Sequence, residues 1–206
     1  MHKRMKAKLA AFLQDPQQTL AQYKADDNSV AARYARAIAH YRTPDLKQAV
    51  PEIDALIHDH PDDAYFHELK GQMLFENGRI AEAVAPYEQA VKLHPENALL
   101  RIEAAQVELE ANDRALVPKA LANLNEAVRF EDRNPDAWRF LAIAYGRSDN
   151  IGMMALALAE QGAASGDYTQ ARQQAARAIK LLPAGPAKQR ALDLQADAKR
   201  EDKGKQ

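Results

Sequence analysis

The segment 64–95 constrains the fold of this chain most strongly. It contains two runs of helix-favouring residues separated by the turn signal Asn77-Gly78-Arg79. Small residues stand where two helices would approach closely, a large aromatic residue lies between them, and a proline closes the segment: Gly71, Ala83, Tyr87, Ala90 and Pro95. A single pair of short helices cannot bury its own apolar face. The segment therefore predicts a fold in which similar pairs stack on one another.

A second copy of this pattern precedes the first. Pro61 lies 34 residues before Pro95, and at the same offset Ala37 takes the place of Gly71. The period and the order of small, aromatic and proline positions resemble the tetratricopeptide repeat, which implies pairs of helices. After Pro95 the period loosens, and the next closing proline is Pro135. The later repeats are therefore expected to be irregular.

The rest of the chain is predicted to be helical as well, because no long alternating run of β-branched residues indicates a strand. We expect a helical lead-in over residues 1–27, about four repeats over 28–185 with the last one irregular, a capping helix over 186–200 and a disordered tail over 201–206. The predicted fold class is an all-α tetratricopeptide-repeat α-solenoid, a right-handed superhelix of antiparallel helix pairs. It forms one domain or two loosely distinct halves.

Two prolines fall inside predicted second helices. Pro51 and Pro86 stand five or six residues after a turn and at nearly equivalent repeat positions. A proline in a helix interior costs about 3 kcal/mol or more, but less harm is done near the first turns. We predict that both helices persist and that each has a local kink.

The first helix is expected to be amphipathic. Apolar side chains recur along it at helical spacing, opposite several basic residues, and they are Met5, Leu9, Phe12 and Leu13. We interpret the basic face as solvated, and contact with an anionic surface is the alternative.

Composition excludes several classes of partner. A formal net charge of −1 over 206 residues gives no electrostatic footprint for nucleic acid. No apolar stretch is long enough to span a bilayer, and lysines interrupt the only candidate signal peptide. The absence of cysteine excludes a disulfide and a zinc–thiolate site, and it is compatible with cytoplasm or periplasm.

Nothing in the sequence supports catalysis by itself. The run His67-Glu68-Leu69-Lys70-Gly71 begins like a zincin helix, but Gly71 stands where the second histidine ligand would be. Histidines and aspartates also cluster at the end of one helix and in the loop after it: His58, Asp59, His60, Asp62 and Asp63. We interpret this cluster as helix-end chemistry. The alternative is a metal-dependent hydrolase built on His58, His60 and Asp62.

Binding of a polypeptide is the favoured function, because the first helices of stacked pairs line a concave groove. The repeat register predicts the groove residues Tyr34, Ile38, Tyr41, Tyr65, Glu68, Gln72, Phe75, Ile102, Gln106, Leu109, Arg139 and Ile143. For Tyr34, Phe75 and Leu109, packing between helices is an equally good interpretation. Glu68 stands where repeats that clamp a C-terminal carboxylate carry a lysine, which disfavours that mode of binding. We expect an extended peptide or a neighbouring protein domain as partner.

The order of segments resembles a more particular family. The strings HKRMKAKLAAFL, SVAARYARAIAHYR, YFHELKGQMLFENGR, AWRFLAIAYGR and AEQGAASGDYTQAR follow one another as in the C-terminal repeat region of BepA-like (YfgC-like) bacterial zinc metallopeptidases. The likeness runs across about residues 2–195. In that family a zincin domain with a His-Glu-x-x-His helix precedes the repeats. This sequence lacks that domain and every residue that would bind zinc, so no catalytic residue is carried over.

The resemblance implies a non-catalytic fragment of an exported metallopeptidase, with zinc expected only in the absent protease domain and no cofactor in this chain. It implies a periplasmic location, and partners that include the protease domain itself, substrate proteins and the outer-membrane assembly machinery. The alternative is a freestanding tetratricopeptide adaptor, cytoplasmic or periplasmic, with no protease attached. The sequence identifies neither the bound protein nor the oligomeric state.

Overall fold

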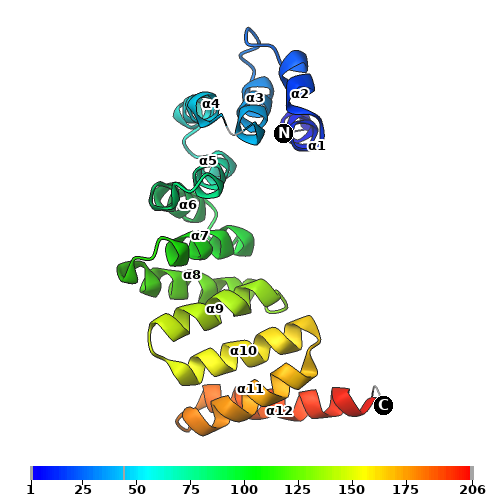
Figure 1. Ribbon diagram of the computed structural model, residues 1–206, viewed down its shortest axis with the longest axis vertical. Coiled ribbons are helices and arrows are strands. Elements are labelled where there is room, and N and C mark those ends of the chain that lie inside the picture. The colour runs from blue at the N-terminus through cyan, green and yellow to red at the C-terminus, as the bar shows by residue number, and fades with distance from the viewer. Residues whose placement is uncertain (1, 44, 205–206) are drawn as a thin grey trace. The chain divides into compact units, whose positions relative to one another are not determined.

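The computed structural model describes residues 2–43 and 45–204, and within them every regular element is helical (Figure 1). The chain divides into two compact units, Met1–His94 (unit 1) and Pro95–Gln206 (unit 2). Unit 1 contains α1 (His2–Leu13), α2 (Pro16–Gln22), α3 (Val30–Arg42), α4 (Leu46–Asp59), α5 (Ala64–Glu76) and α6 (Ile80–Leu93). Unit 2 contains α7 (Ala98–Glu110), a 3-10 turn (Arg114–Leu116), α8 (Val117–Phe130), α9 (Pro135–Arg147), α10 (Ile151–Ser165), α11 (Tyr168–Leu181) and α12 (Pro186–Gly204). The expected all-α fold class is confirmed.

Short polar side chains fix where the helices of unit 1 begin. Ser29, Asp45 and Asp63 each accept a hydrogen bond from a backbone N–H in the first turn of α3, α4 and α5. Such caps satisfy donors that a helix leaves unpaired at its start. The loops between helices stay short as a result, and α3 packs against α4 and α5 against α6 (Figure 1).

The close contact predicted at Gly71 is present. A Cβ atom built on Gly71 would lie 2.6 Å from Cδ2 of Tyr87, which is buried in α6. The turn between α5 and α6 also forms where it was expected, with Gly78 at a φ of 77°, a conformation that glycine adopts without steric cost. These two glycines let the helices approach each other and then reverse the chain.

The core of unit 1 combines a few large side chains with many alanines. The rings of Tyr34 and Phe66 meet edge to face with centroids 5.2 Å apart, and Ile38, Ile53 and Met73 belong to the same buried cluster. In the described residues as a whole, alanine accounts for more than half of the buried apolar side chains. Methyl-sized side chains permit short distances between helix axes, as the repeat pattern requires.

A buried arginine ties the loop before α3 to the first helix pair. The Arg36 side chain is 5% exposed, and its Nε donates to Oε1 of Glu52 at 2.7 Å. Its Nη1 donates to the backbone oxygens of Lys24 and Asp27 at 2.7 and 2.8 Å. A charge this deeply buried is tolerated because its donors are paired.

Helix α1 forms where it was predicted, but its buried face is not the one expected. Met5, Leu9 and Leu13 are 51%, 55% and 82% exposed, whereas Ala7 and Ala11 are fully buried. The prediction of an inward Met–Leu stripe was therefore wrong for these three residues. α1 packs closely on α3, so its fully buried apolar side chains are methyl-sized, and Phe12 packs against the same cluster while only partly buried.

Both interior prolines lie within unbroken helices. Pro51 falls in α4 and Pro86 in α6, so the helix prediction is confirmed at both positions. The kinks remain predictions.

The C-terminal helix is longer than expected. α12 begins at Pro186 and continues to Gly204, so residues 201–204 are helical and not a tail. The last two positions of the predicted tail, 205 and 206, lie outside the described residues.

Two buried clusters hold unit 2 together. One joins α7, α8 and α9 through residues such as Leu109, Leu124 and Leu141, and the other joins α10, α11 and α12. Beside the second cluster, Glu160 is 7% exposed and accepts two hydrogen bonds from Arg190, Nε to Oε1 at 2.6 Å and Nη2 to Oε2 at 2.8 Å. This fork-like pair connects α10 to α12.

Candidate protein-binding surface

Four of the predicted groove residues share one side of α5. Tyr65, Glu68, Gln72 and Phe75 are all half-buried, and spacings of three and four residues place them in a row along the helix. Nε2 of Gln72 donates to Oε1 of Glu76 at 2.9 Å, one turn further on. This side of α5 therefore combines aromatic surface with amide and carboxylate groups.

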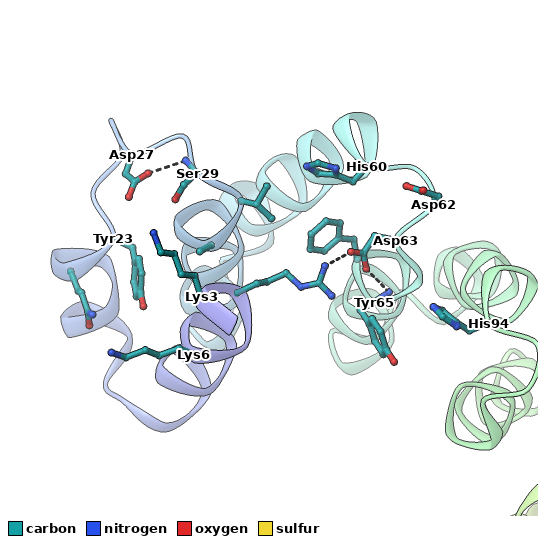
Figure 2. Close-up of a pocket in the computed structure, with 15 residues that line it drawn as sticks. Lys3, Lys6, Tyr23, Asp27, Ser29, His60, Asp62, Asp63, Tyr65 and His94 are labelled. Atoms are coloured by element: carbon teal, nitrogen blue, oxygen red, sulfur yellow. Dashed lines mark hydrogen bonds and ion pairs between the residues drawn. The ribbon is translucent and has the colours of Figure 1, made fainter. Parts of the chain in front are cut away.

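Tyr65 borders a cavity of about 1000 Å³ in unit 1 (Figure 2). α1, the end of α2, the loop before α3 and the loop between α4 and α5 provide most of the lining. The residues that line it are Lys3, Arg4, Lys6, Gln22, Tyr23, Asp27, Ser29, Val30, Ala31, His60, Asp62, Asp63, Tyr65, Phe66 and His94. This volume lies at the upper end of the range of about 300–1,000 Å³ that is typical of pockets for drug-sized ligands.

An ion pair crosses this cavity from α1 to the start of α5. The Arg4 guanidinium pairs with Asp63, which also accepts a hydrogen bond from the backbone N–H of Tyr65 at 3.1 Å (Figure 2). The same guanidinium lies 5.0 Å from the ring centroid of Phe66 and 5.9 Å from that of Tyr65. Arg4 therefore has both a carboxylate and aromatic rings as partners.

Lys3, Lys6 and His94 also line the cavity. Within the described part of the chain, Lys3 and Lys6 form no ion pair, and His94 is held by its ring contact with Tyr65, with centroids 5.7 Å apart (Figure 2). These groups are available to an incoming ligand that carries acceptors.

The carboxyl group of Glu68 lies among charges from two helices. Burial raises its pKa above the ordinary value of 4.5, Lys8 of α1 opposes that rise, and the nearby Asp63 carboxylate adds to it. Glu68 is therefore a poorly solvated acid facing the basic side of α1.

The structure contradicts three groove predictions on α3. Tyr34, Ile38 and Tyr41 are 1%, 0% and 8% exposed, because α1 packs against the face on which they lie. The alternative interpretation of Tyr34 as a packing residue holds.

In unit 2 the predicted residues divide between core and surface. Ile102 and Leu109 of α7 are buried in the cluster with α8 and α9, so their assignment to a groove was wrong. Gln106 is half-buried and donates to Glu110 at 3.0 Å. Arg139 and Ile143 of α9 are exposed.

Arg139 is held at the surface by neighbours on its own helix. Its Nε lies 3.2 Å from Oδ1 of Asp136, and its guanidinium lies 4.1 Å from the ring centroid of Phe140. It therefore presents a positioned cation on α9.

Unit 2 contains a smaller cavity of about 250 Å³, which sequence analysis did not predict. It lies between α8, α9, α10 and α12, and the Glu160–Arg190 pair and Trp138 are among the residues that line it. Sequence analysis assigned no site role to Trp138. Its indole N–H donates to the backbone oxygen of Asp132 at 2.7 Å.

The histidine and aspartate cluster serves the helix ends, as interpreted from the sequence. Asp59 pairs with Arg33 at 2.5 Å, and this hydrogen bond holds the pKa of Asp59 below its ordinary value. Asp63 caps α5, and His60 ends α4 with its ring 6.2 Å from that of Phe66. Over residues 2–43 and 45–204, no three histidine or acidic side chains gather as a metal site would require.

Arg4, Lys8 and His94 are contributors that sequence analysis missed. The basic start of the chain was interpreted as a solvated face, and His94 was assigned no role. The excess of cations on α1 was a signal of contact with acidic groups, but its target on α5 could be identified only in three dimensions.

Comparisons with known proteins agree with this architecture. A profile of the tetratricopeptide repeat matches residues 34–98 and 76–116. The chain has a tetratricopeptide-repeat fold. Proteins of this fold generally act as non-catalytic scaffolds that bind proteins or peptides. None of the described helices is both long and apolar enough to cross a membrane.

Solved tetratricopeptide structures resemble the chain over most of its length. The structure of YrrB, described as a TPR protein with an unusual peptide-binding site, has a TM-score of 0.67 at 15% identity and covers 83% of this chain and 89% of its own. A structure of the MamA protein has a TM-score of 0.62 at 13% identity and covers 91% of this chain and 90% of its own. At these identities the likeness establishes the fold alone. A search of curated protein sequences finds no match.

Proposed function

We propose that this chain binds a polypeptide through the side of α5 that carries Tyr65 and Gln72, next to the cavity of about 1000 Å³ in unit 1. The observation that carries the proposal is the position of Tyr65. Its half-buried ring lines a cavity of about 1000 Å³, and its centroid lies 5.9 Å from the Arg4 guanidinium and 5.7 Å from the centroid of the His94 ring. An aromatic side chain held in place among polar groups is a typical anchor of a protein interface.

Two further features support peptide binding on α5. The polar groups of Gln72 and Glu76 continue the row of Tyr65 along the helix and offer both donors and acceptors to a peptide backbone. The tetratricopeptide-repeat fold is shared with YrrB, whose description names a peptide-binding site.

The test is a selection of binding peptides followed by measurement on variants. Peptides are selected by display against the purified chain, and the affinity of the tightest one is measured by calorimetry. Tyr65→Ala is expected to weaken binding at least tenfold, and Gln72→Ala severalfold. Gln173→Ala, an exposed glutamine on α11, is the matched control and should leave the affinity unchanged. Equal affinity for wild type and Tyr65→Ala would show that this surface is not the binding site.

We further propose that the chain is the recognition region of an exported zinc metallopeptidase that acts in outer-membrane protein quality control. The support is the order of the five sequence strings, which resembles that of BepA-like enzymes. In this proposal the chain is periplasmic, it has no catalytic residue or cofactor of its own, and its partners are the protease domain, substrate proteins and outer-membrane assembly components. A freestanding tetratricopeptide adaptor is the second candidate, favoured by the fold alone.

The encoding locus distinguishes the two candidates. The metallopeptidase proposal predicts an in-frame His-Glu-x-x-His segment upstream of Met1 and release of the protein by osmotic shock of the native cells. Initiation of translation at Met1, with the protein retained in the cytoplasmic fraction, would instead support the adaptor.

A further inference from the structure

Helix α1 occupies the positions on α3 that correspond to the binding side of α5. Glu68, Gln72 and Phe75 of α5 each lie 34 residues after a residue of α3, and those counterparts are Tyr34, Ile38 and Tyr41. The α5 residues are half-buried, but the α3 residues are buried in one cluster with Ala7 and Ala11 of α1. Figure 1 shows α1 beside α3. α1 therefore lies where a ligand of this repeat would lie.

Polar contacts hold α1 near both of its ends. Near its start, Arg4 pairs with Asp63 at the beginning of α5. Near its end, Nη1 of Arg42 donates to the backbone oxygen of Ala11 at 2.8 Å and also to that of Gln14. Arg42 thus caps carbonyl groups that a helix leaves unpaired at its C-terminus. Contacts of this kind fix the position of a helical ligand on its receptor surface.

The charges of α1 complement those of α5. The first 14 residues contain several lysines, an arginine and a histidine, but no acidic residue. Asp63 caps the start of α5, and Glu68 and Glu76 follow it within the helix. Arg4 pairs with the first of these, and Lys8 lies near enough to the second to oppose the rise of its pKa. The surface beneath α1 is thus suited to a basic helix.

α1 also matches this surface incompletely. The hydroxyl group of Tyr34 is buried under it without a hydrogen-bond partner, and a buried polar group left in this way destabilises the folded state. On its outer side, α1 leaves Met5, Leu9 and Leu13 exposed. A helix that belonged permanently to the core would be expected to give the Tyr34 hydroxyl a hydrogen-bond partner and to bury the three apolar side chains.

We propose that α1 is an exchangeable occupant, and that the face formed by α3 and α5 binds a basic amphipathic helix of a partner protein in its place. The partner helix carries small residues four positions apart, as Ala7 and Ala11 are, with an arginine one turn earlier to pair with Asp63 and a polar group to meet the Tyr34 hydroxyl. This inference rests on the proposed function of α5 and specifies the class of its partner.

The test uses the full chain, and a fluorescein-labelled synthetic peptide of residues 2–14 serves as the partner-like helix. Arg4→Glu places a carboxylate opposite Asp63 and should loosen α1, and Arg42→Ala should loosen its other end. Both variants are expected to bind the peptide at least tenfold more tightly than the wild-type chain does in fluorescence anisotropy. Lys47→Glu makes the same charge change at an exposed residue of α4 that lines neither cavity and has no ion pair in the described part of the chain, and it should give no increase.

An exchange of charges between residues 4 and 63 tests whether the ion pair between them holds α1 in place. The double variant Arg4→Glu/Asp63→Arg restores attraction between its own α1 and α5, so its affinity for the peptide should return to the wild-type level. Asp63→Arg alone should prefer a peptide that carries the Arg4→Glu change. Hydrogen exchange should show that the amides of α1 open at least tenfold more often in Arg4→Glu than in wild type, while those of α4 are unchanged.

Several outcomes would overturn this inference. One is equal peptide affinity for the wild type, Arg4→Glu and Arg42→Ala. Concentration-dependent dimers of the loosened variants would identify a second copy as the occupant, and binding of the loosened variants to anionic vesicles but not to the peptide would identify a lipid surface. Because the display-selected peptide is tested on Tyr65→Ala independently, the proposed function can survive any of these results.

Discussion

Gly71 lies against the ring of Tyr87, so that a Cβ atom at residue 71 would be 2.6 Å from Cδ2 and 3.1 Å from Cγ of that ring. Cγ is close to the backbone of α6, and the ring therefore cannot swing away as the end of a flexible side chain could. The contact sets how closely α5 and α6 can pack.

Gly71→Ala should consequently destabilise unit 1, although alanine favours helix more than glycine does. Forcing one methyl group into this contact is expected to cost about 1–3 kcal/mol in the free energy of unfolding, measured by urea denaturation. The double variant Gly71→Ala/Tyr87→Leu should lose less stability than the sum of the losses in the two single variants, because the smaller side chain relieves the overlap. A stabilised Gly71→Ala protein would show that the two helices separate without cost.

Arg36→Met should destabilise the chain far more than the same change at a neighbouring arginine. It leaves the Glu52 carboxylate and two loop carbonyls without their donor, and breaking such a buried network costs about 3 kcal/mol or more. Arg33→Met removes an exposed ion pair with Asp59 and should have a much smaller effect. Urea denaturation of both variants measures the difference, and similar costs would contradict a special role of Arg36.

The Glu160–Arg190 pair offers a test of the second cluster of unit 2. Arg190→Ala leaves the buried Glu160 carboxylate without its main donor and is expected to cost about 1–3 kcal/mol. The double variant Glu160→Leu/Arg190→Leu should recover most of that stability, since it leaves no unpaired charge. Arg200→Ala, which breaks the exposed pair with Asp197, should have no measurable effect. If the double variant lost as much stability as Arg190→Ala does, the unpaired Glu160 carboxylate would not be the cause of the loss.

The raised pKa of Glu68 predicts a dependence of stability on pH. Burial, the largest cause, makes the protonated form the favoured one in the folded state, and Asp63 acts in the same direction against Lys8. The folded state therefore binds the proton more tightly than the unfolded state does. The contribution of Glu68 to stability is greatest below the ordinary value of 4.5 and falls as pH rises from there through the raised folded pKa.

Glu68→Gln should remove this fall, and at pH 7 it should have a higher melting temperature than the wild type in calorimetric scans from pH 3 to 8. Glu82→Gln is the control, because the pKa of Glu82 is shifted in the opposite direction. The hydrogen bond from Arg79 lowers the pKa of Glu82, so its contribution is present at neutral pH and lost as pH falls. If Glu68→Gln lowered the melting temperature at pH 7, attraction to Lys8 would outweigh burial.

The fold could be predicted from sequence because its determinants are local. Gly71, Asn77-Gly78 and Tyr87 have fixed spacings within one helix pair, and each lies in the structure as the pattern required. Helices α4 and α6 were also predicted correctly, although each contains a proline. The helical pattern of the whole repeat was a stronger signal than one residue that disfavours helix.

The binding surface was only partly predictable, because exposure depends on contacts between segments distant in sequence. Tyr34 and Glu68 are equivalent by their 34-residue offset, yet one is buried and the other half-buried. The difference arises from α1, whose docking on α3 has no signature in the repeat period. Ile102 was misassigned for a similar reason, because neighbouring helices of unit 2 enclose the side of α7 on which it lies.

Among the described residues, alanine is the most frequent buried apolar residue in both units. A methyl group has no alternative rotamers and no polar atoms, so contacts of this kind do not depend on the chemistry carried by the outer faces of the helices. Substitutions on those faces can therefore accumulate without disturbing the interior. A lineage of such chains could change what it recognises many times over while its helices keep the same spacing.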